Sequence, residues 1–572
     1  MAKKEYRLRE DIPKRIDEEL TSYPATTRKL LYYRGIRSRE EAEQFLNPDY
    51  NTHLHDPYLM RDMERAVGRI LQAVEDKEKI LIYSDYDADG IPGAVVLREF
   101  FEKIGHANVE NYIPDRHDEG YGLHLEAVEN FGGEGVNLLI TVDCGTVDFE
   151  QIARAKALGI DVIVTDHHEA NGFLPEAHAI LNPKQENCPY PEKILCGSGV
   201  VFKLIQAILS RNRFNLKDGQ EKWFLDLVGI ATLSDMVPLT GENRALAHYG
   251  LKVLQKSPRP GLQKLWRKLN LDPKNLSEDD VGFTLSPRIN AASRMGHPMD
   301  AFRLLSTKDE TEADQLSDYL NRLNDERKGV VASIVKEIKK HIRELSSLPN
   351  VLVLGNPSWK PALLGLAANS LLDDFSRPIF LWGRNGEREL KGSCRSDGSV
   401  NLVALMEKVK DTFIQFGGHK LAGGFEVSHE KIHRLEEELN RAYEEVKSSP
   451  ESAEADSGQW IDSRLSLSGV NWDTYREIEK LAPFGVGNPK PVFLFENVSP
   501  KTVRQFGKEG NHMELVFENG SEKNIRAISF FSKPKSFEKK PQVGMPVDLI
   551  ASFEKSNFRN YPELRLRIVD IV

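Results

Sequence analysis

The chain has 572 residues, too many for a single hydrophobic core, and we expect three or four domains. No apolar run reaches the length of a membrane span, and the first residues lack the apolar core of a signal peptide, which predicts a cytoplasmic protein with no membrane partner. A formal net charge of −10 does not indicate a nucleic-acid-binding protein, and four cysteines without a Cys-x-x-Cys pair argue against a zinc ribbon or a disulfide framework.

The first 75 residues are charged and helical in pattern, and nothing in them indicates chemistry. Within them, Ser38–Leu46 begins with a capping-box pattern and ends before Pro48, which predicts a short helix. We interpret residues 1–75 as an N-terminal helical segment that covers or packs against the following domain.

An acidic turn follows the first predicted strand. Residues 80–83 form an apolar run that leads into Asp85, Asp87 and Asp89, and helix-forming residues follow at 92–104. Strand, acidic turn and helix begin an α/β unit, in which ligands gather at the carboxyl ends of the strands. Alternate strand residues share a face, and carboxylates at that spacing repel one another unless a cation lies between them. The turn therefore indicates a metal site.

Several kinds of site could use such a turn. A calcium-binding EF-hand loop needs a glutamate at its twelfth position, where this chain has Val96, and it needs a preceding helix rather than a strand. An aspartyl phosphatase of the haloacid-dehalogenase type, a two-metal hydrolase and a plain acidic surface turn remain as alternatives at this point.

Three further apolar stretches end in Asp or His. These are 138–142 before Asp143, 161–165 before Asp166, His167 and His168, and 224–233 before Asp235. Alternation of strands with helices predicts a parallel sheet. Carboxylates and neutral imidazoles are the ligands expected of an Mn²⁺ or Mg²⁺ pair. The two histidines could instead be a solvated or core pair, but their position after a strand favours metal binding. The dehalogenase interpretation explains none of these later residues.

Four segments resemble the motifs of the DHH phosphoesterase superfamily: Asp85-Tyr-Asp-Ala-Asp-Gly90, Thr141-Val-Asp-Cys-Gly145, Thr165-Asp-His-His-Glu169 and Asp235. Further segments resemble the RecJ family of single-stranded-DNA-specific exonucleases: Tyr112–Arg116, Glu119–Leu123, Asn182-Pro183 before Tyr190-Pro191, Ser286–Met295 and Leu481–Pro489.

The resemblance implies how the site is used. Asp143 would bridge two metal ions; Asp85 and Asp87 would hold one ion, and Asp89, His167 and Asp235 would hold the other. His168 would lie beside the scissile phosphate as a hydrogen-bond donor or proton shuttle. The expected catalytic residues are therefore Asp143, His167 and His168.

The predicted nucleic-acid-binding residues lie in two regions. Arg116, Arg288 and Arg294 belong to the motifs above, and guanidinium forks suit phosphate. A second α/β domain holds Lys391-Gly-Ser-Cys-Arg-Ser396 and the glycine-rich 417–425, whose backbone can form an anion-binding nest. This domain resembles DHHA1, which implies that Lys391, Ser393, Arg395, His419 and Lys420 contact the nucleic-acid backbone.

Residues 307–345 keep the apolar spacing of one helix, which would span roughly 55 Å and join two lobes. Thr307 and Glu310 are its expected capping box. Residues 444–458 are polar and read as a linker. Beyond them, short alternating strands predict a small barrel of the oligonucleotide-binding type, and residues 501–572 carry a net charge of +4.

Aromatic and basic side chains lie close together in this tail: Phe530, Phe531, Phe558 and Tyr561 near Lys533, Lys535, Arg559 and Arg565. Aromatic platforms with basic groups suit single strands, although most of these aromatics are expected in the core.

The predicted fold class is α/β: a parallel-sheet DHH domain joined by a long helix to a smaller α/β DHHA1 domain, with a C-terminal OB-like β-barrel. The predicted boundaries are 1–75 for the N-terminal segment, 76–305 for the DHH domain, 306–346 for the connecting helix, 347–445 for DHHA1, 446–458 for the linker and 459–572 for the OB-like domain.

The resemblance implies a nuclease that uses Mn²⁺ or Mg²⁺ and degrades single-stranded DNA from the 5′ end to 5′-mononucleotides in recombination and repair. It also implies a single-strand-binding protein and a RecQ-type helicase as partners. A dinucleotide phosphodiesterase of the same superfamily and a non-catalytic replication scaffold are the alternatives. The residues Pro92, Gly93, Ser293 and Lys360 depart from the family pattern, and none of them is an expected metal ligand.

Overall fold

The computed structural model describes residues 6–170, 172–384, 390–448, 459–507, 510–518, 524–532, 534, 537–556 and 562–572. The chain divides into two compact units. The first unit contains Pro57–Asp235 and Gly250–Ser457, and the second contains Lys3–Asp56, Met236–Tyr249 and Gly458–Val572. Part of the N-terminal segment therefore groups with the C-terminal part of the chain.

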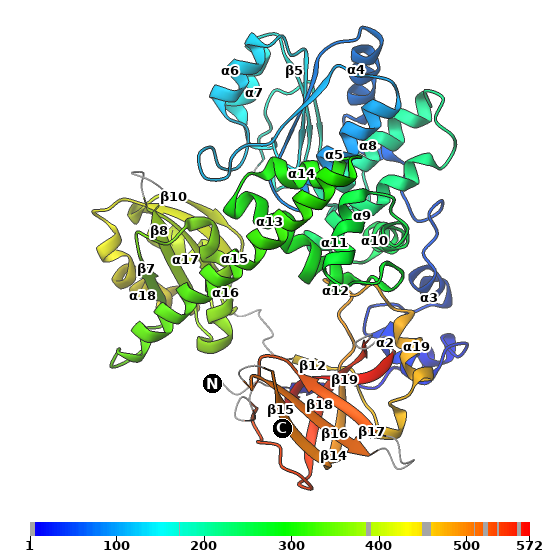
Figure 1. The fold of residues 1–572 in the computed structure, drawn as a ribbon, viewed down its shortest axis with the longest axis vertical. Helices are drawn as coiled ribbons and strands as arrows, with labels where there is room; N and C mark the ends of the chain where they lie inside the picture. Colours follow the sequence, from blue (N-terminus) through cyan, green and yellow to red (C-terminus); the bar gives the residue numbers. More distant parts are fainter. Residues whose placement is uncertain are drawn as a thin grey trace. The chain divides into compact units, whose positions relative to one another are not determined.

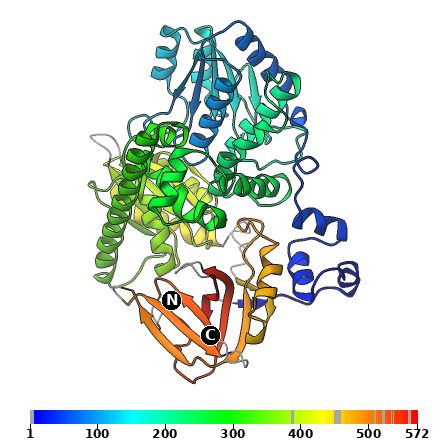
Figure 2. The same cartoon turned by 45° about the vertical axis from the view of Figure 1, so that its right-hand side comes forward.

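The first unit contains a five-stranded parallel sheet of order β3-β2-β4-β5-β6. Its strands are β2 (Ile80–Ser84), β3 (Val109–Tyr112), β4 (Leu138–Val142), β5 (Asp161–Thr165) and β6 (Ala179–Leu181). Helices α6 (Leu125–Gly133) and α7 (Phe149–Ala157) cover one face, and α4 (Met63–Glu75), α5 (Gly90–Lys103) and α8 (Gly197–Arg211) cover the other (Figures 1 and 2). The predicted strands and their parallel pairing are confirmed.

The register of this sheet aligns the ends of its central strands. Ser84 of β2 pairs with Val142 of β4, and Val142 pairs with Thr165 of β5. Because the strands are buried on both faces, their near-continuous apolar sequence is the pattern expected of a central parallel strand. The residues that follow the three strands therefore leave the sheet at one edge.

A series of helices follows the sheet in the chain. Its members are α9 (Leu225–Ser234), α10 (Gly241–Leu254), α11 (Pro260–Lys268), α12 (Glu278–Asp280), the π-helical turn η4 (Val281–Leu285), α13 (Ser286–Met295) and α14 (Pro298–Ser306). The apolar stretch before Asp235 is thus a helix, α9, while the other three are strands.

Helix α15 (Glu310–Arg343) is the predicted long helix and packs against α13 and α16. Its predicted capping box is wrong: the N-cap is Asp309, whose carboxylate accepts a hydrogen bond from the Glu312 amide. Thr307 instead accepts a bond from the Asp309 amide and donates to Glu312. Aspartate is a strong N-cap residue, and here Asp309, rather than the threonine two positions earlier, is the N-cap of α15.

A second sheet in the first unit has the order β10-β11-β9-β8-β7, and only the β7–β8 pair is parallel. Its strands are β7 (Leu352–Gly355), β8 (Ile379–Arg384), β9 (Leu390–Arg395), β10 (Phe413–Gly418) and β11 (Ala422–Val427). Helices α17 (Leu402–Lys408) and α18 (Ile432–Lys447) pack on one face, and α15 and α16 (Pro361–Phe375) pack on the other.

The second unit is built on a seven-stranded sheet of order β13-β14-β18-β19-β17-β16-β15. The strands are β13 (Ser463–Arg464), β14 (Phe493–Val498), β15 (Thr502–Phe506), β16 (His512–Glu518), β17 (Asn524–Ser529), β18 (Val547–Ser556) and β19 (Glu563–Ile571). Met513, Leu515 and Phe517 of β16 are fully buried, as their alternation predicts. Strand β1 (Tyr6–Leu8) pairs in parallel with β12 (Gln459–Ile461), so the N-terminal residues pair with the beginning of the C-terminal part of the chain.

Short helices complete the second unit: α1 (Lys14–Glu19), α2 (Ala25–Tyr32), α3 (Arg39–Leu46) and α19 (Trp472–Glu479). The capping box predicted at Ser38 and Glu41 is present at the start of α3.

Short 3₁₀ turns in the chain lie at Pro57–Leu59, Gln220–Phe224, Pro273–Asn275, Lys410–Thr412 and Leu467–Gly469.

Arg244 of α10 is buried in the second unit. Its guanidinium donates to the carbonyls of Phe45, Leu481 and Ala482, at 2.6, 2.9 and 3.1 Å, and lies over the Phe45 ring. Burial lowers the pKa of Arg244 to about 9. Three distant segments of the chain are thereby tied together by one side chain.

Two sequence predictions fall wholly or partly outside the described residues. The predicted linker lies largely there, and its first residues, through Lys447, belong to α18. Of the tail aromatics, Phe558 and Tyr561 lie outside, as do Lys533, Lys535 and Arg559. Phe531 is 82% exposed, whereas the Phe530 ring lies under the guanidinium of Arg567. Among the helices of the described residues, none is long and apolar enough to cross a membrane.

Candidate active site

The turn between β2 and α5 carries three aspartates. A Cβ at Gly90 would lie 2.5 Å from the carbonyl oxygen of Asp85, so only glycine allows the chain to fold back this tightly. The Asp87 carboxylate accepts hydrogen bonds from the amides of Asp89 and Gly90, at 2.7 and 3.2 Å. These bonds hold the acidic turn in shape at the start of α5.

Asp89 is held by the N-terminus of a second helix. Its carboxylate accepts hydrogen bonds from the amides of Gly197 and Ser198 at the start of α8, at 2.6 and 2.8 Å. The Ser198 hydroxyl also donates to the Asp89 carbonyl. The positive end of the α8 dipole favours the ionised carboxylate, so α8 both orients and stabilises this side chain.

Asp143 follows β4 in a left-handed backbone conformation with φ of 63°. Aspartate tolerates this conformation better than most residues. A Cβ at Gly197 would lie 2.7 Å from the Cβ of Asp143, so the glycine at the start of α8 makes room for the aspartate. The close approach of β4 and α8 thus places Asp143 beside Asp89.

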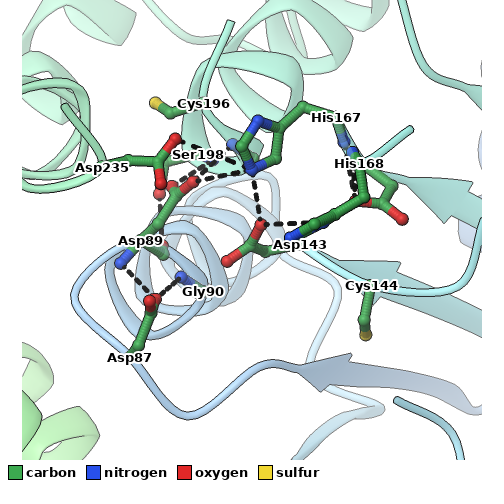
Figure 3. Close-up of polar contacts among 12 residues, drawn as sticks. Asp87, Asp89, Gly90, Asp143, Cys144, His167, His168, Cys196, Ser198 and Asp235 are labelled. Atoms are coloured by element: carbon green, nitrogen blue, oxygen red, sulfur yellow. Dashed lines mark hydrogen bonds and ion pairs between the residues drawn. The ribbon is translucent and has the colours of Figure 1, made fainter. Parts of the chain in front are cut away.

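Residues from four separate segments meet around the His167 ring (Figure 3). Its Nε2 lies 3.0 Å from Asp143 Oδ1 and 3.7 Å from the nearest oxygens of both Asp89 and Asp235. Among the described residues, three groups have their ligand atoms within 4.8 Å of one another. One is Asp143, His167 and His168. The other two are Asp85, Asp87 and Asp143, and then Asp89, His167 and Asp235. The last two groups match the two predicted ligand sets, and Asp143 is close to both. Metal ligation by these residues remains a prediction.

His168 is oriented by contacts that the sequence did not reveal. Its Nδ1 lies 2.8 Å from Asp166 Oδ1 and 3.0 Å from the Tyr121 hydroxyl, which also donates to the Asp143 carbonyl. Asp166 additionally accepts bonds from the amides of Thr146, His167 and His168. With Nδ1 engaged by Asp166, Nε2 is the ring nitrogen available for a substrate. Both Asp166 and Tyr121 lie inside the motifs recognised in the sequence.

The acidic groups of this cluster oppose one another's ionisation. Burial and neighbouring carboxylates raise the pKa of Asp85 and Asp143 well above the ordinary value, that of Asp89 to about 6 and that of Asp235 to about 9. Burial, together with the charge of His168, lowers the pKa of His167 to about 4, which keeps its imidazole neutral. Burial also lowers the pKa of His168, but the hydrogen bond and charge of Asp166 outweigh it and raise the pKa to about 9.

The donor set fits divalent cations. Asp85 Oδ1 and Asp143 Oδ1 are buried and receive no hydrogen bond from the described residues. Buried polar atoms are normally paired, and a cation would pair both and remove the repulsion among the carboxylates. Carboxylate oxygens with one neutral imidazole are suited to Mn²⁺ or Mg²⁺.

The arginines of the first predicted nucleic-acid-binding region occupy different environments. Arg116 lies over the Tyr86 ring at 4.7 Å, and its charge opposes the rise in the pKa of Asp85. Arg294 donates to the carbonyl of Ala362 at the start of α16. Arg288 is buried and is fixed by Asn321 Oδ1 and the Thr284 carbonyl. Arg288 therefore has a structural role in joining α13 to α15, and its phosphate contact remains a prediction.

The predicted nucleic-acid-binding residues of the second sheet lie on strand β9 and in the turn between β10 and β11. Lys391, Ser393 and Arg395 alternate along β9, so they share one face. A Cβ at Gly365 of α16 would lie 2.6 Å from the Arg395 guanidinium, so this glycine makes room for it. His419 and Lys420 form the turn between β10 and β11, which the His419 amide closes on the Ala422 carbonyl at 2.7 Å.

The structure gives a reason for one departure from the family pattern. A Cβ at Gly93 would lie 2.7 Å from Val142 Cγ1 and 2.9 Å from Ser198 Oγ, so α5 packs here against both β4 and α8. Pro92 is buried in the first turn of α5 beside it, and Ser293 is buried in α13. Lys360 is the N-cap residue of α16.

The fold and the site define a phosphoesterase of the DHH class. The model of the DHH family N-terminal domain matches residues 79–232, that of the DHHA1 domain matches 348–447, and that of the RecJ OB domain matches 461–570. The chain belongs to the RecJ family, because it is 30% identical over 573 residues to the single-stranded-DNA-specific exonuclease RecJ of Haemophilus influenzae, covering 98% of this chain and 94% of that protein. The predicted resemblance and the predicted fold class are confirmed.

Two other relatives show how much of the chain is similar in sequence and in structure. The chain is 35% identical over 513 residues to RecJ of Bacillus subtilis, which covers 90% of this chain but only 64% of the longer relative. The crystal structure of RecJ from Thermus thermophilus in complex with Mn²⁺ superposes with a TM-score of 0.82 at 25% identity, over 99% of this chain and 79% of that one.

Proposed function

We propose that the protein is a metal-dependent exonuclease that hydrolyses single-stranded DNA from the 5′ end to 5′-mononucleotides. The observation that carries this proposal is the position of Asp143 between two groups of acidic and histidine ligands, in a chain of the RecJ family. The name of the relatives specifies single-stranded DNA, and a solved relative binds Mn²⁺. Direction and products rest on family resemblance.

The chain's own residues have distinct tasks in this reaction. Asp85, Asp87 and Asp143 would hold one ion, and Asp89, His167 and Asp235 the other, with Asp143 shared. When bound, such an ion pair activates water and stabilises the charge that develops on the phosphate and the leaving oxygen.

His168 would donate a hydrogen bond to the substrate phosphate through Nε2, because its Nδ1 is held by Asp166. Arg116, Arg288, Arg294 and the β9 residues would neutralise and position the strand. Charge-assisted hydrogen bonds of this kind are shorter and stronger than neutral ones.

Other parts of the proposal rest on resemblance alone. A role in recombination and repair, a single-strand-binding protein and a RecQ-type helicase as partners, and a cytoplasmic location belong to this group. The domain boundaries given above for the sequence also remain a proposal.

The test uses the full chain with Mn²⁺ or Mg²⁺ and strands labelled separately at each end. Asp143→Ala should abolish nucleotide release and reduce the number of bound metal ions measured by mass spectrometry. Asp76→Ala, an exposed aspartate after α4, is the matched control and should behave as wild type. A wild-type rate in Asp143→Ala would refute the proposal. Equal turnover of dinucleotides and long strands would instead favour a dinucleotide phosphodiesterase.

A further inference from the structure

Tyr121 lies on the loop between β3 and α6, and this loop is fixed on both sides of the tyrosine. Before it, the Glu119 carboxylate accepts a hydrogen bond from the Tyr112 hydroxyl at 2.6 Å. After it, the Gly122 carbonyl accepts one from the buried Tyr83 hydroxyl at 2.7 Å. Because the backbone is already held, little conformational entropy is lost when the Tyr121 side chain makes further contacts.

Two glycines direct the tyrosine into the active site. Gly120 and Gly122 have φ of 96° and 89°, a backbone conformation that favours glycine. A Cβ at Gly122 would also lie 2.8 Å from Asp148 Oδ1, so a side chain is excluded there for lack of space. The sharp turns on either side allow Tyr121 to reach the residues that follow β4 and β5, namely Asp143 and His168.

The Tyr121 hydroxyl joins these two segments of the site. It donates a hydrogen bond to the Asp143 carbonyl at 3.2 Å and lies 3.0 Å from His168 Nδ1. A hydroxyl has one hydrogen and can also accept. Because its hydrogen is directed to the Asp143 carbonyl, the hydroxyl accepts from the Nδ1–H of His168. This Nδ1–H is therefore shared between Tyr121 and the Asp166 carboxylate, which lies 2.8 Å away.

The His168 ring needs this second contact because packing alone does not hold it. Its side chain is 42% exposed, whereas that of His167 is 11% exposed. One hydrogen bond to Asp166 fixes the place of Nδ1 but leaves the ring plane free to turn about that bond. Tyr121 adds a bond at the same nitrogen and a ring contact, with centroids 5.4 Å apart and planes at 60°. The ring is thereby held beside Asp143, whose Oδ1 lies 3.9 Å from Nδ1 (Figure 3).

We propose that Tyr121 is a positioning residue for phosphodiester hydrolysis: its hydroxyl fixes the His168 imidazole relative to the predicted metal ligand Asp143, so that Nε2 faces the scissile phosphate. The inference rests on the proposed function, since that phosphate belongs to the strand that the metal cluster would cut. A reacting group must be held closely to its productive geometry, and misplacement is costly in rate. Tyr121 thus acts on the rate through His168, and not on the binding of metal ions or of the strand.

The experiment compares Tyr121→Phe, His168→Gln and the double variant in the full chain. The matched control is Tyr23→Phe in the second unit, which removes an exposed hydroxyl that contacts Glu43 at 3.4 Å. For each protein, kcat and KM for nucleotide release from a single strand are measured with Mn²⁺, together with Mn²⁺ affinity. NMR of ¹⁵N-histidine-labelled, metal-free protein reports the ring nitrogens directly, and the signals of His168 are those lost in His168→Gln.

Tyr121→Phe should lower kcat by about 10-fold, because one hydrogen bond that orients the imidazole is lost, and should leave KM and Mn²⁺ affinity within about 2-fold of wild type. In the His168→Gln background the same change should have no further effect, because Tyr121 acts through the missing ring. The His168 ring signals should shift or broaden in Tyr121→Phe, while those of His167 stay in place. Tyr23→Phe should match wild type in every measurement.

Three results would overturn the proposal. One is a Tyr121→Phe variant with wild-type kcat and unchanged His168 signals. Another is an equal loss of kcat with and without His168, since the tyrosine would then act by another route. The third is a loss of Mn²⁺ affinity in place of kcat, since the hydroxyl would then serve the Asp143 backbone alone. If wild type released no nucleotide, the proposed function would fail, and the NMR comparison would still decide whether Tyr121 positions His168.

Discussion

Gly197 offers a direct test of how α8 positions the predicted metal ligands Asp89 and Asp143. In Gly197→Ala, the new Cβ would lie 2.7 Å from the Asp143 Cβ, 2.9 Å from its Oδ1 and 3.0 Å from its Cα. Ordinary contacts begin at 3.4 Å, so Asp143 or the start of α8 must move by about 0.7 Å. Displacements near 1 Å can cost about 100-fold in rate, and we expect kcat to fall by about 10- to 100-fold.

Gly199→Ala is the matched control, two residues along the same helix. Its Cβ would meet nothing closer than Cys196 Sγ at 3.5 Å, an ordinary contact. Alanine favours a helix over glycine by up to about 1 kcal/mol, so this variant should keep full activity and equal or higher stability. Nucleotide release, Mn²⁺ affinity and circular dichroism are measured for both variants. If Gly197→Ala matches wild type in rate and Mn²⁺ affinity, the packing argument for Asp143 is wrong.

Two further predictions concern stability. Removing divalent ions with EDTA should lower the melting temperature, because the carboxylates are left to repel one another. Free Mn²⁺ at 100 times its Kd should raise the free energy of unfolding again by about 2.7 kcal/mol. Asp143→Ala should respond less to Mn²⁺ than wild type, and equal responses would contradict the predicted metal cluster. Arg244→Ala should destabilise the second unit by about 3 kcal/mol or more, because three carbonyls lose their donor and a buried side chain is removed. Unfolding in urea, followed by limited proteolysis, measures the loss of stability. The exposed Arg39→Ala is the control, and equal urea midpoints for the two variants would contradict the role of Arg244.

The signals that predict the candidate metal ligands are local in the sequence. Asp85 and Asp143 each come directly after an apolar strand, His167 comes two residues after another, and parallel strands bring their carboxyl ends together. The supporting contacts were not predictable in the same way. Gly197 meets Asp89 across 108 positions of sequence, and the contact of Tyr121 with His168 spans 47. A glycine or a tyrosine in a sequence does not indicate which distant residue it will contact, so these two contacts could not be predicted.

The start of α15 shows the limit of cap prediction. Thr307 and Asp309 are both good N-cap residues, and the prediction chose Thr307 because a threonine followed by Glu310 has the Ser/Thr-x-x-Glu form of a capping box. Asp309 also has a glutamate three positions later, Glu312, so this feature does not separate the two candidates. In the structure both side chains contact Glu312: the Asp309 carboxylate accepts a hydrogen bond from its amide, and the Thr307 hydroxyl donates one to its carboxylate. The helix therefore begins after Asp309.

Arg327 shows a second limit. Within a long amphipathic helix, an arginine has the pattern of an ordinary solvated charge. In the structure its Nε is buried without a hydrogen-bond partner among the described residues. Arg288 differs from Arg327, because its motif predicted a contact with phosphate. In the structure its guanidinium is already hydrogen-bonded to Asn321 Oδ1 and the Thr284 carbonyl.

The amino-acid sequence by itself determined the parallel sheet, the family and the six predicted metal ligands, because strand periodicity and short motifs are written in adjacent residues. The tertiary structure decided how Asp143 is held against α8, how Arg288 is bonded to α15, and that part of the N-terminal segment groups with the C-terminal part of the chain. These features depend on the approach of segments that are far apart in the chain, and that approach is set by the packing of the whole core rather than by any local pattern.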